Sequence, residues 1–476
     1  MKKIFQYIAI LILVASACTE DKGTYDYSPL NEVLISGIND EYIALSEAPF
    51  TILPTVEQKL VDDESVLEYM WYAYNAGSQL YSADTLSFSK DLDLDSLKLD
   101  PKNYELVFRA TDTSTGIYYD YRSQLYVKGF PDGLQVLSSR EGNAQVSILR
   151  GTGEGLSDFE AFKLQNDNQV AGANPVSIIG INEFMRRGKP FRIALYCDDD
   201  KLGSYATGTK LEKTIDVTDA FQQIAAPTSI KGALGHPESF ATGVFADDNK
   251  LYTTYQPGLF GDECSFMWSF DNVSPAFNSV IPYGGFVLFN PVTTGFCEVD
   301  SWGSRVSQYP PIDDEEAPFD RTNTGLSAVY GKRVSDYAMG VFKDEATNQR
   351  YLLAILNKEA AFKKEMNGAD LENADIFDFL NSKQVLFYAF ANKIYTYDVV
   401  ANKVLYTYEM GSEINISHIE VSANDKQLFV GLGDGSDDVD SGSVYIMNID
   451  LDGEILGIHE AYDHKFGKVV DFFENY

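Results

Sequence analysis

Apolar and polar residues alternate in short runs from residue 31 onward, and turn-forming residues separate the runs. Such alternation predicts β-strands with one buried face. Six or seven short strands within about a hundred residues are typical of an Ig-like β-sandwich, which we expect over residues 30–130. Trp71 falls on the third run and is the expected buried tryptophan of its core. The runs are NEVLISGI, PFTILPTV, LEYMWYAYN, DTLSFSK, NYELVFRATD and YRSQLYVKG.

Residues 131–476 form strand–turn units without a long helical pattern. The clearest unit, residues 392–409, contains two alternating runs around a turn at Ala401-Asn402 and predicts a hairpin. Similar units recur about every forty to fifty residues, which is the period of propeller blades and predicts about six to eight of them. An array of two-sheet sandwiches is the rival interpretation. Only residues 362–382 have helical character, and we expect a loop insertion with a short helix there.

The N-terminus carries the pattern of a secretion signal. Two lysines precede an apolar run that is shorter than the about 20 residues of a membrane-spanning helix. The run ends in small residues, which is typical of a signal peptide over residues 1–17. The sequence ASAC resembles a bacterial lipobox, in which the cysteine, here Cys18, is diacylglycerylated and becomes the first residue of the mature protein. An ordinary signal peptide with an incidental cysteine is the alternative.

Cys18 is therefore the expected lipidation site. Its acyl chains, palmitate among them, would attach the protein to a membrane without spanning it. The polar residues 18–29 are expected to form an acylated tether. Glu20 and Asp21 resemble the acidic export signal of Bacteroidota lipoproteins, so we expect a lipid-anchored protein of the outer membrane that faces the cell exterior.

Net charge and cysteine content limit which partners, disulfides and metal sites the sequence predicts. The formal net charge of −34 repels nucleic acid, so no nucleic-acid partner is expected. If Cys18 carries lipid, three of the four cysteines remain, and Cys264 with Cys297 is one candidate disulfide. The sequence contains no CxxC motif and no Cys/His cluster, so it predicts no metal site.

Two acidic stretches could supply oxygen ligands to calcium. In residues 91–100, Ser96 occupies the position of the loop glycine and Lys102 that of the late acid, so a strand with an acidic outer face is the favoured interpretation. Residues 431–443 fit no standard calcium loop and favour a solvated loop. No cofactor is therefore expected, with calcium as the open alternative.

Aromatic residues crowd residues 252–320, between glycines and prolines. Aromatic rings on loops can stack on sugar rings or peptide side chains, whereas rings in a blade core only pack. Trp302 and then Tyr309 are the best candidates for exposed rings, and Trp268 completes the predicted ligand-binding set. No GxSxG, HExxH or P-loop motif is visible, so no catalytic residue is predicted, and enzymatic activity is open but not favoured.

Residues 18–38, Trp71 and the run NYELVFRATD together resemble the PKD-like family of lipoproteins from Bacteroidota, most strongly over residues 18–130. The expected fold is thus all-β, an Ig/PKD-like β-sandwich over residues 30–130 followed by a degenerate β-propeller over residues 131–476. The resemblance implies a surface accessory protein of a SusC/SusD-type outer-membrane import system that captures glycan or oligopeptide nutrient. Among individual residues, only Cys18 takes a role from it.

We therefore expect a cell-surface lipoprotein that binds nutrient and acts as an accessory subunit of a SusC/SusD-type TonB-dependent importer. One alternative is a propeller-fold polysaccharide hydrolase or lyase, which predicts a funnel with two or more acids and a His or Tyr at one mouth of the ring. The other alternative is a structural or adhesive surface protein.

Overall fold

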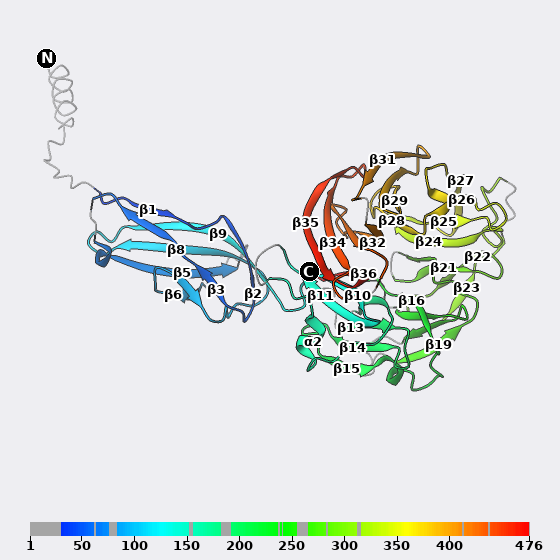
Figure 1. The fold of residues 1–476 in the computed structure, drawn as a ribbon, viewed down its shortest axis with the longest axis horizontal. Helices are drawn as coiled ribbons and strands as arrows, with labels where there is room; N and C mark the ends of the chain where they lie inside the picture. Colours follow the sequence, from blue (N-terminus) through cyan, green and yellow to red (C-terminus); the bar gives the residue numbers. More distant parts are fainter. Residues whose placement is uncertain are drawn as a thin grey trace, which may run out of the picture. The chain divides into compact units, whose positions relative to one another are not determined.

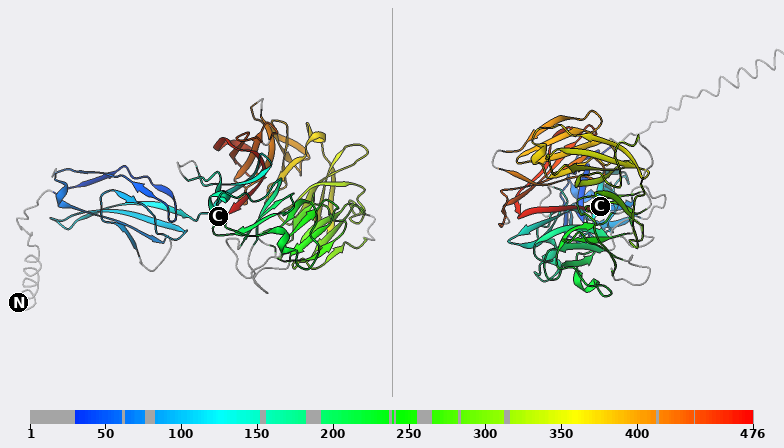
Figure 2. Two further views of the ribbon diagram at one scale, coloured as in Figure 1. Left: turned by 60° about the horizontal axis from the view of Figure 1, so that its bottom comes forward. Right: turned by 90° about the vertical axis from the view of Figure 1, so that its right-hand side faces the viewer.

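The all-β fold class is confirmed. The structure, a computed structural model, has two compact units, one up to Val127 and one from Lys128 onward (Figures 1 and 2). The helices are short, and none of them is long and apolar enough to cross a bilayer. They are η1 (Glu64–Val66), α2 (Ala161–Gln165), η2 (Val217–Ala220) and η3 (Leu371–Asn373). The structure describes residues 30–60, 63–75, 83–151, 156–181, 192–236, 239, 241–254, 265–281, 284–311, 316–411, 414–436 and 438–475.

The first unit is a β-sandwich. A five-stranded sheet packs against two strand pairs, and alternating apolar side chains from both layers fill the space between them. The sheet has the order β2 (Glu41–Leu45), β9 (Tyr118–Lys128), β8 (Asn103–Asp112), β5 (Leu67–Asn75), β6 (Asp84–Ser87). The pairs are β1 (Val33–Ser36) with β4 (Thr55–Gln58), and β3 (Phe50–Ile52) with β7 (Leu92–Leu94).

Trp71 lies at the centre of this sandwich and is fully buried, as its place on the third run predicts. Its ring packs on Phe108 of the neighbouring strand, with 4.6 Å between ring centroids. Its indole N–H donates to the carbonyl oxygen of Lys90 at 3.0 Å, so burial leaves no polar atom of the ring unpaired. The leucines of residues 91–100 also enter this core, which agrees with the interpretation of that stretch as a strand with an acidic outer face.

The second unit contains seven antiparallel sheets within the described residues, arranged around a common centre (Figure 1). Six are four-stranded: β12 (Pro175–Ile181), β13 (Arg192–Cys197), β14 (Gly203–Thr207), β15 (Lys213–Asp216); β16 (Ile230–Leu234), β17 (Gly243–Ala246), β18 (Leu251–Thr254), β19 (Phe266–Phe270); β20 (Asn278–Val280), β21 (Phe286–Asn290), β22 (Gly295–Val299), β23 (Val306–Gln308); β24 (Ser327–Val334), β25 (Tyr337–Lys343), β26 (Arg350–Leu356), β27 (Glu359–Glu365); β28 (Ile376–Phe379), β29 (Val385–Phe390), β30 (Lys393–Asp398), β31 (Lys403–Glu409); and β32 (Asn415–Val421), β33 (Gln427–Gly433), β34 (Gly442–Ile449), β35 (Ile455–Phe466).

The seventh sheet joins the two ends of this unit. It has the order β11 (Asn143–Leu149), β10 (Gly133–Arg140), β36 (Lys468–Asn475), so the last strand of the chain pairs with the first strand of the unit. The register runs from Gly133 opposite Asn475 to Ser139 opposite Lys468. This sheet has three strands among the described residues. On the free side of β11, its residue Ile148 forms an isolated bridge with Asp158 in place of a fourth strand.

Apolar clusters join each sheet to the next and close the ring. Each cluster takes buried side chains from two neighbouring sheets, because a sheet that is apolar on both faces must be covered on both. The cluster that closes the ring combines Phe429 and Val444 of the sixth sheet with Val136, Val469 and Phe472 of the seventh. The unit is therefore a seven-bladed β-propeller, within the range of blades that the repeat spacing predicts.

One local expectation is right only in part. Residues 362–382 contain a short helix as expected, η3, but it lies between the end of β27 and strand β28, and strand pairing overrides the helical propensity of FKKE. Cys297 on β22 is a buried free thiol, and Cys264, its candidate disulfide partner, lies outside the described residues. The hairpin expected over residues 392–409 is confirmed as β30 and β31, with Asn402 at positive φ in the turn.

The ring closure can be tested at Phe472, which is buried between two blades and packs on Phe429 with 5.8 Å between ring centroids. We expect Phe472→Ala to destabilise the propeller by about 3–5 kcal/mol, because truncation of a buried phenylalanine leaves a cavity. Calorimetric unfolding should show the propeller transition shifted down and the sandwich transition unchanged. Phe88→Ala, at a side chain that is 75% exposed in the sandwich, is the control and should shift neither.

Candidate functional site

The innermost strands of neighbouring blades contact one another around the centre of the ring. Here β24 contacts β28, β28 contacts β32, β32 contacts β36, and β36 contacts β12. These strands carry several ionisable side chains that are buried or partly buried. We call six of them the inner-strand cluster: Tyr330, Lys332, Asp378, His418, Glu420 and Asp471.

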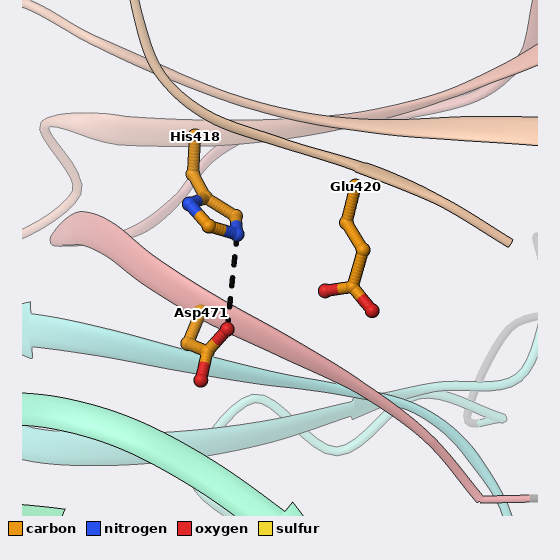
Figure 3. A group of neighbouring side chains, drawn as sticks. All are labelled: His418, Glu420 and Asp471. Carbon is orange, nitrogen blue, oxygen red and sulfur yellow. Dashed lines mark ion pairs between the residues drawn. The ribbon is translucent and has the colours of Figure 1, made fainter. Parts of the chain in front are cut away.

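His418, Glu420 and Asp471 face one another (Figure 3). His418 and Glu420 are two positions apart on β32, so both side chains leave the same face of the strand. Asp471 comes from β36, and its Oδ1 lies 3.7 Å from Nε2 of His418. One candidate ligand atom from each of the three residues lies within 4.8 Å of the others.

Hydrogen bonds from β12 and from its own strand hold Asp471 in place. The hydroxyl of Ser177 and the backbone N–H of Ile178 donate to its Oδ2, at 2.7 and 2.9 Å. The backbone N–H of Phe472 donates to Oδ1 at 3.1 Å. Burial nevertheless raises the pKa of Asp471, against the lowering effects of His418 and of these hydrogen bonds. The carboxyl group therefore keeps a fixed orientation, but burial disfavours its ionised form.

Glu420 is more strongly perturbed. Burial raises its pKa well above the ordinary value, and the charges of Asp471, Asp378 and Glu474 add to the shift, while Lys332 opposes it. Among the described residues, its carboxylate has no hydrogen-bond or ion-pair partner. It is the one carboxylate of the inner-strand cluster without a direct partner.

Asp378 on β28 ties three blades together. It accepts hydrogen bonds from the hydroxyl of Tyr330 at 2.7 Å and from Nζ of Lys332 at 2.9 Å, both on β24. It also accepts one from the backbone N–H of Val421 on β32 at 2.6 Å. Its side chain is only 2% exposed, so this carboxylate needs its cationic partner. Burial and the charge of Asp378 raise the pKa of Tyr330 well above the ordinary value, which keeps the phenol neutral.

The three aromatic residues predicted to bind ligand differ in their exposure to solvent. Trp302 lies in a turn and is 41% exposed, as expected. Trp268 is half-buried on β19, where it pairs with Thr253 of β18, and the hydroxyl of Thr253 donates to the carbonyl oxygen of Gly303 at 2.6 Å. The structure thus brings the two tryptophans to neighbouring elements. Tyr309 is only 6% exposed and belongs to a blade core, so the expectation of an exposed ring is wrong there.

A cavity of about 230 Å³ lies next to the turn that carries Trp302. Its walls carry charges of both signs, including Glu298 and Lys358, whose carboxylate oxygen and Nζ are 2.7 Å apart. Tyr309 also lines it, and burial raises the pKa of that phenol. The lining residues are Glu298, Asp300, Arg305, Ser307, Gln308, Tyr309, Pro310 and Lys358.

Sequence reasoning missed the inner-strand cluster. Its signal was present as ionisable residues within apolar strands: His418 and Glu420 at alternate positions of ISHIEV (residues 416–421), and Asp471 in VVDFFE (469–474). The two segments become neighbours only because β36 returns to the ring beside β32 and β12. Cys18, Glu20 and Asp21 lie outside the described residues.

Residues 18–173 match the family model described as PKD-like family. The chain carries a PKD-like region. The match starts at Cys18, covers the whole sandwich and ends before β12 of the propeller. No curated protein matches the chain.

Several solved structures resemble the chain at low identity, and at this level the likeness concerns the fold alone. A quinoprotein alcohol dehydrogenase-like protein from Bacteroides thetaiotaomicron is 11% identical, with a TM-score of 0.46 over 92% of this chain and 97% of that chain. Sqt1 from Saccharomyces cerevisiae is 12% identical, with a TM-score of 0.46 over 72% and 85%. The Cps50 (Swd1) β-propeller domain of Myceliophteria thermophila is 8% identical, with a TM-score of 0.31 over 49% and 71%.

The raised pKa of Glu420 predicts that Glu420→Gln stabilises the protein in a pH-dependent way. Because the raised pKa makes the folded state bind the proton more tightly than the unfolded state, Glu420 stabilises the protein at low pH and loses that contribution as pH rises through its folded pKa. The variant should therefore be more stable than the wild type at pH 8, and the difference should vanish below about pH 4, near the ordinary pKa of glutamate.

Urea unfolding of the propeller between pH 4 and pH 8 measures this difference. Glu372→Gln, on an exposed turn, is the matched control and should leave the pH profile unchanged. A variant at position 420 that is less stable than the wild type at pH 8 would contradict the assignment of Glu420 as a strained carboxylate.

Proposed function

We propose that this chain is a lipid-anchored protein of the outer membrane that captures nutrient at the cell surface as an accessory of a SusC/SusD-type TonB-dependent importer. The observation that carries the proposal is the start of the PKD-like family match at Cys18. That residue follows the predicted signal peptide directly, so the matched region begins where the mature lipoprotein would begin. The acyl chains on Cys18 would hold the protein at the membrane without a spanning helix.

In this proposal the propeller provides the ligand-binding surface. Trp302 offers an exposed ring in the turn between Asp300 and Arg305, two residues that help to line the cavity. An exposed aromatic face next to charged groups of both signs suits a sugar ring or a peptide, because the ring stacks while the charged groups form hydrogen bonds. Both ligand classes, glycan and oligopeptide, fit this chemistry.

A second candidate is a polysaccharide hydrolase or lyase, and the inner-strand cluster favours it. The cluster combines two carboxylates with raised pKa values, Glu420 and Asp471, with a histidine and a tyrosine. A carboxyl group whose pKa is raised is suited to serve as a general acid, and paired carboxylates perform glycoside hydrolysis. Release of new reducing or unsaturated ends from a panel of polysaccharides is the assay that separates enzyme from binding protein.

The anchor is tested by metabolic labelling of cells with an alkyne analogue of palmitate. We expect the wild-type protein to carry the label and to fractionate with the outer membrane, and Cys18→Ala to lose both properties. Cys197→Ala, at a buried free thiol, is the control and should keep the label. A labelled or membrane-bound Cys18→Ala protein would refute the anchor.

The ligand contact is tested at Trp302. Once a glycan or peptide library has yielded a binder, Trp302→Ala should weaken its binding about tenfold, because the lost stacking is worth about 1.4 kcal/mol. The titration should be repeated with Phe88→Ala, which removes an exposed ring from the sandwich and should bind like the wild type. Unchanged affinity in Trp302→Ala would remove this turn from the binding site.

A further inference from the structure

The three residues of Figure 3 offer a donor set that suits a metal ion. One imidazole nitrogen and two carboxylate oxygens, from His418, Glu420 and Asp471, converge from two neighbouring strands. Imidazole combined with carboxylate suits zinc and similar first-row ions, whereas calcium prefers oxygen ligands alone.

The geometry requires only small adjustments to close around an ion. Ligand atoms bound to one tetrahedral zinc lie about 3.3–3.5 Å apart, since each sits about 2.0–2.2 Å from the metal. Nε2 of His418 and Oδ1 of Asp471 are already 3.7 Å apart, and all three donor atoms lie within 4.8 Å of one another. The terminal torsion of a glutamate is soft, so rotation of Glu420 can shorten the remaining distances.

Hydrogen bonds orient the carboxylate of Asp471, as is usual for a carboxylate that binds a metal. Ser177 and Ile178 donate hydrogen bonds to its Oδ2, which leaves Oδ1 directed at His418. Hydrogen bonds of this kind, made by groups behind the ligand, orient carboxylates in metal sites.

The second observation is the lack of positive charge around Glu420. Its carboxylate has no direct partner among the described residues and is flanked by Asp471 and Asp378. The nearby ammonium group of Lys332 is already bound to Asp378, at 2.9 and 3.1 Å. Glu420 and Asp471 are partly exposed, and carboxylates that crowd together repel one another. A divalent ion between them offsets this repulsion.

We propose that His418, Glu420 and Asp471 bind a divalent ion of the zinc class between β32 and β36 of the propeller. Three protein ligands leave a fourth position open for water or for a ligand of the protein. The inference rests on these residues alone and is independent of the lipid anchor and of the importer.

The chain offers a matched control in His459. Its Nε2 lies 3.7 Å from a carboxylate oxygen of Glu460, the same separation as in the pair of His418 with Asp471, but no third ligand completes a group there among the described residues. His459→Ala therefore removes a histidine–carboxylate pair without touching the proposed site.

The experiment is isothermal titration of the chelator-stripped, untagged full chain in detergent with ZnCl₂ and, separately, CaCl₂. We expect about one zinc ion per chain, a higher melting temperature with zinc, and much weaker binding of calcium. His418→Ala and Glu420→Gln should each weaken zinc binding at least tenfold, whereas His459→Ala should bind like the wild type.

Three outcomes would overturn the proposal. They are no stoichiometric zinc binding by the wild type, equal affinity in wild type and Glu420→Gln, or a loss in His459→Ala as large as in His418→Ala. If His418→Ala does not fold, Glu420→Gln decides, because it keeps the size of the side chain and relieves charge crowding in the metal-free protein.

Discussion

The pairing of β36 with β10 is the interaction on which the propeller depends. Every other blade is built from consecutive strands, whereas this blade needs the two ends of the unit at once. Without β36, β10 would expose an unpaired edge, and the apolar cluster around Phe429 and Val444 would lose its cover. The closure thus converts six locally folded sheets into one ring in which each apolar face is buried.

The same pairing assembles the inner-strand cluster. Asp471 reaches His418 and Glu420 only because β36 enters the ring between β32 and β12. Ser177 on β12 then fixes the orientation of Asp471, while Asp378 and Lys332 fasten the other side of the cluster to β24 and β28. Ring closure and the inner-strand cluster therefore depend on the same strand.

Period-two alternation was enough to predict the all-β fold, the sandwich around Trp71 and a propeller with about the right number of blades. Helix propensity misled at residues 362–365, which pair as the end of β27, while the short helix expected in this segment is present as η3. The choice of Tyr309 as an exposed ring failed because a residue beside prolines in sequence can still point into a blade core. The inner-strand cluster could not be predicted from the sequence for another reason. His418 and Asp471 are brought together by ring closure, which no local pattern encodes.

The late position of β36 has a consequence for biogenesis. Synthesis from the N-terminus delivers β10 well before β36, so the sandwich can fold early while the ring stays open until β36 is available. A propeller without β36 would keep a free edge along β10.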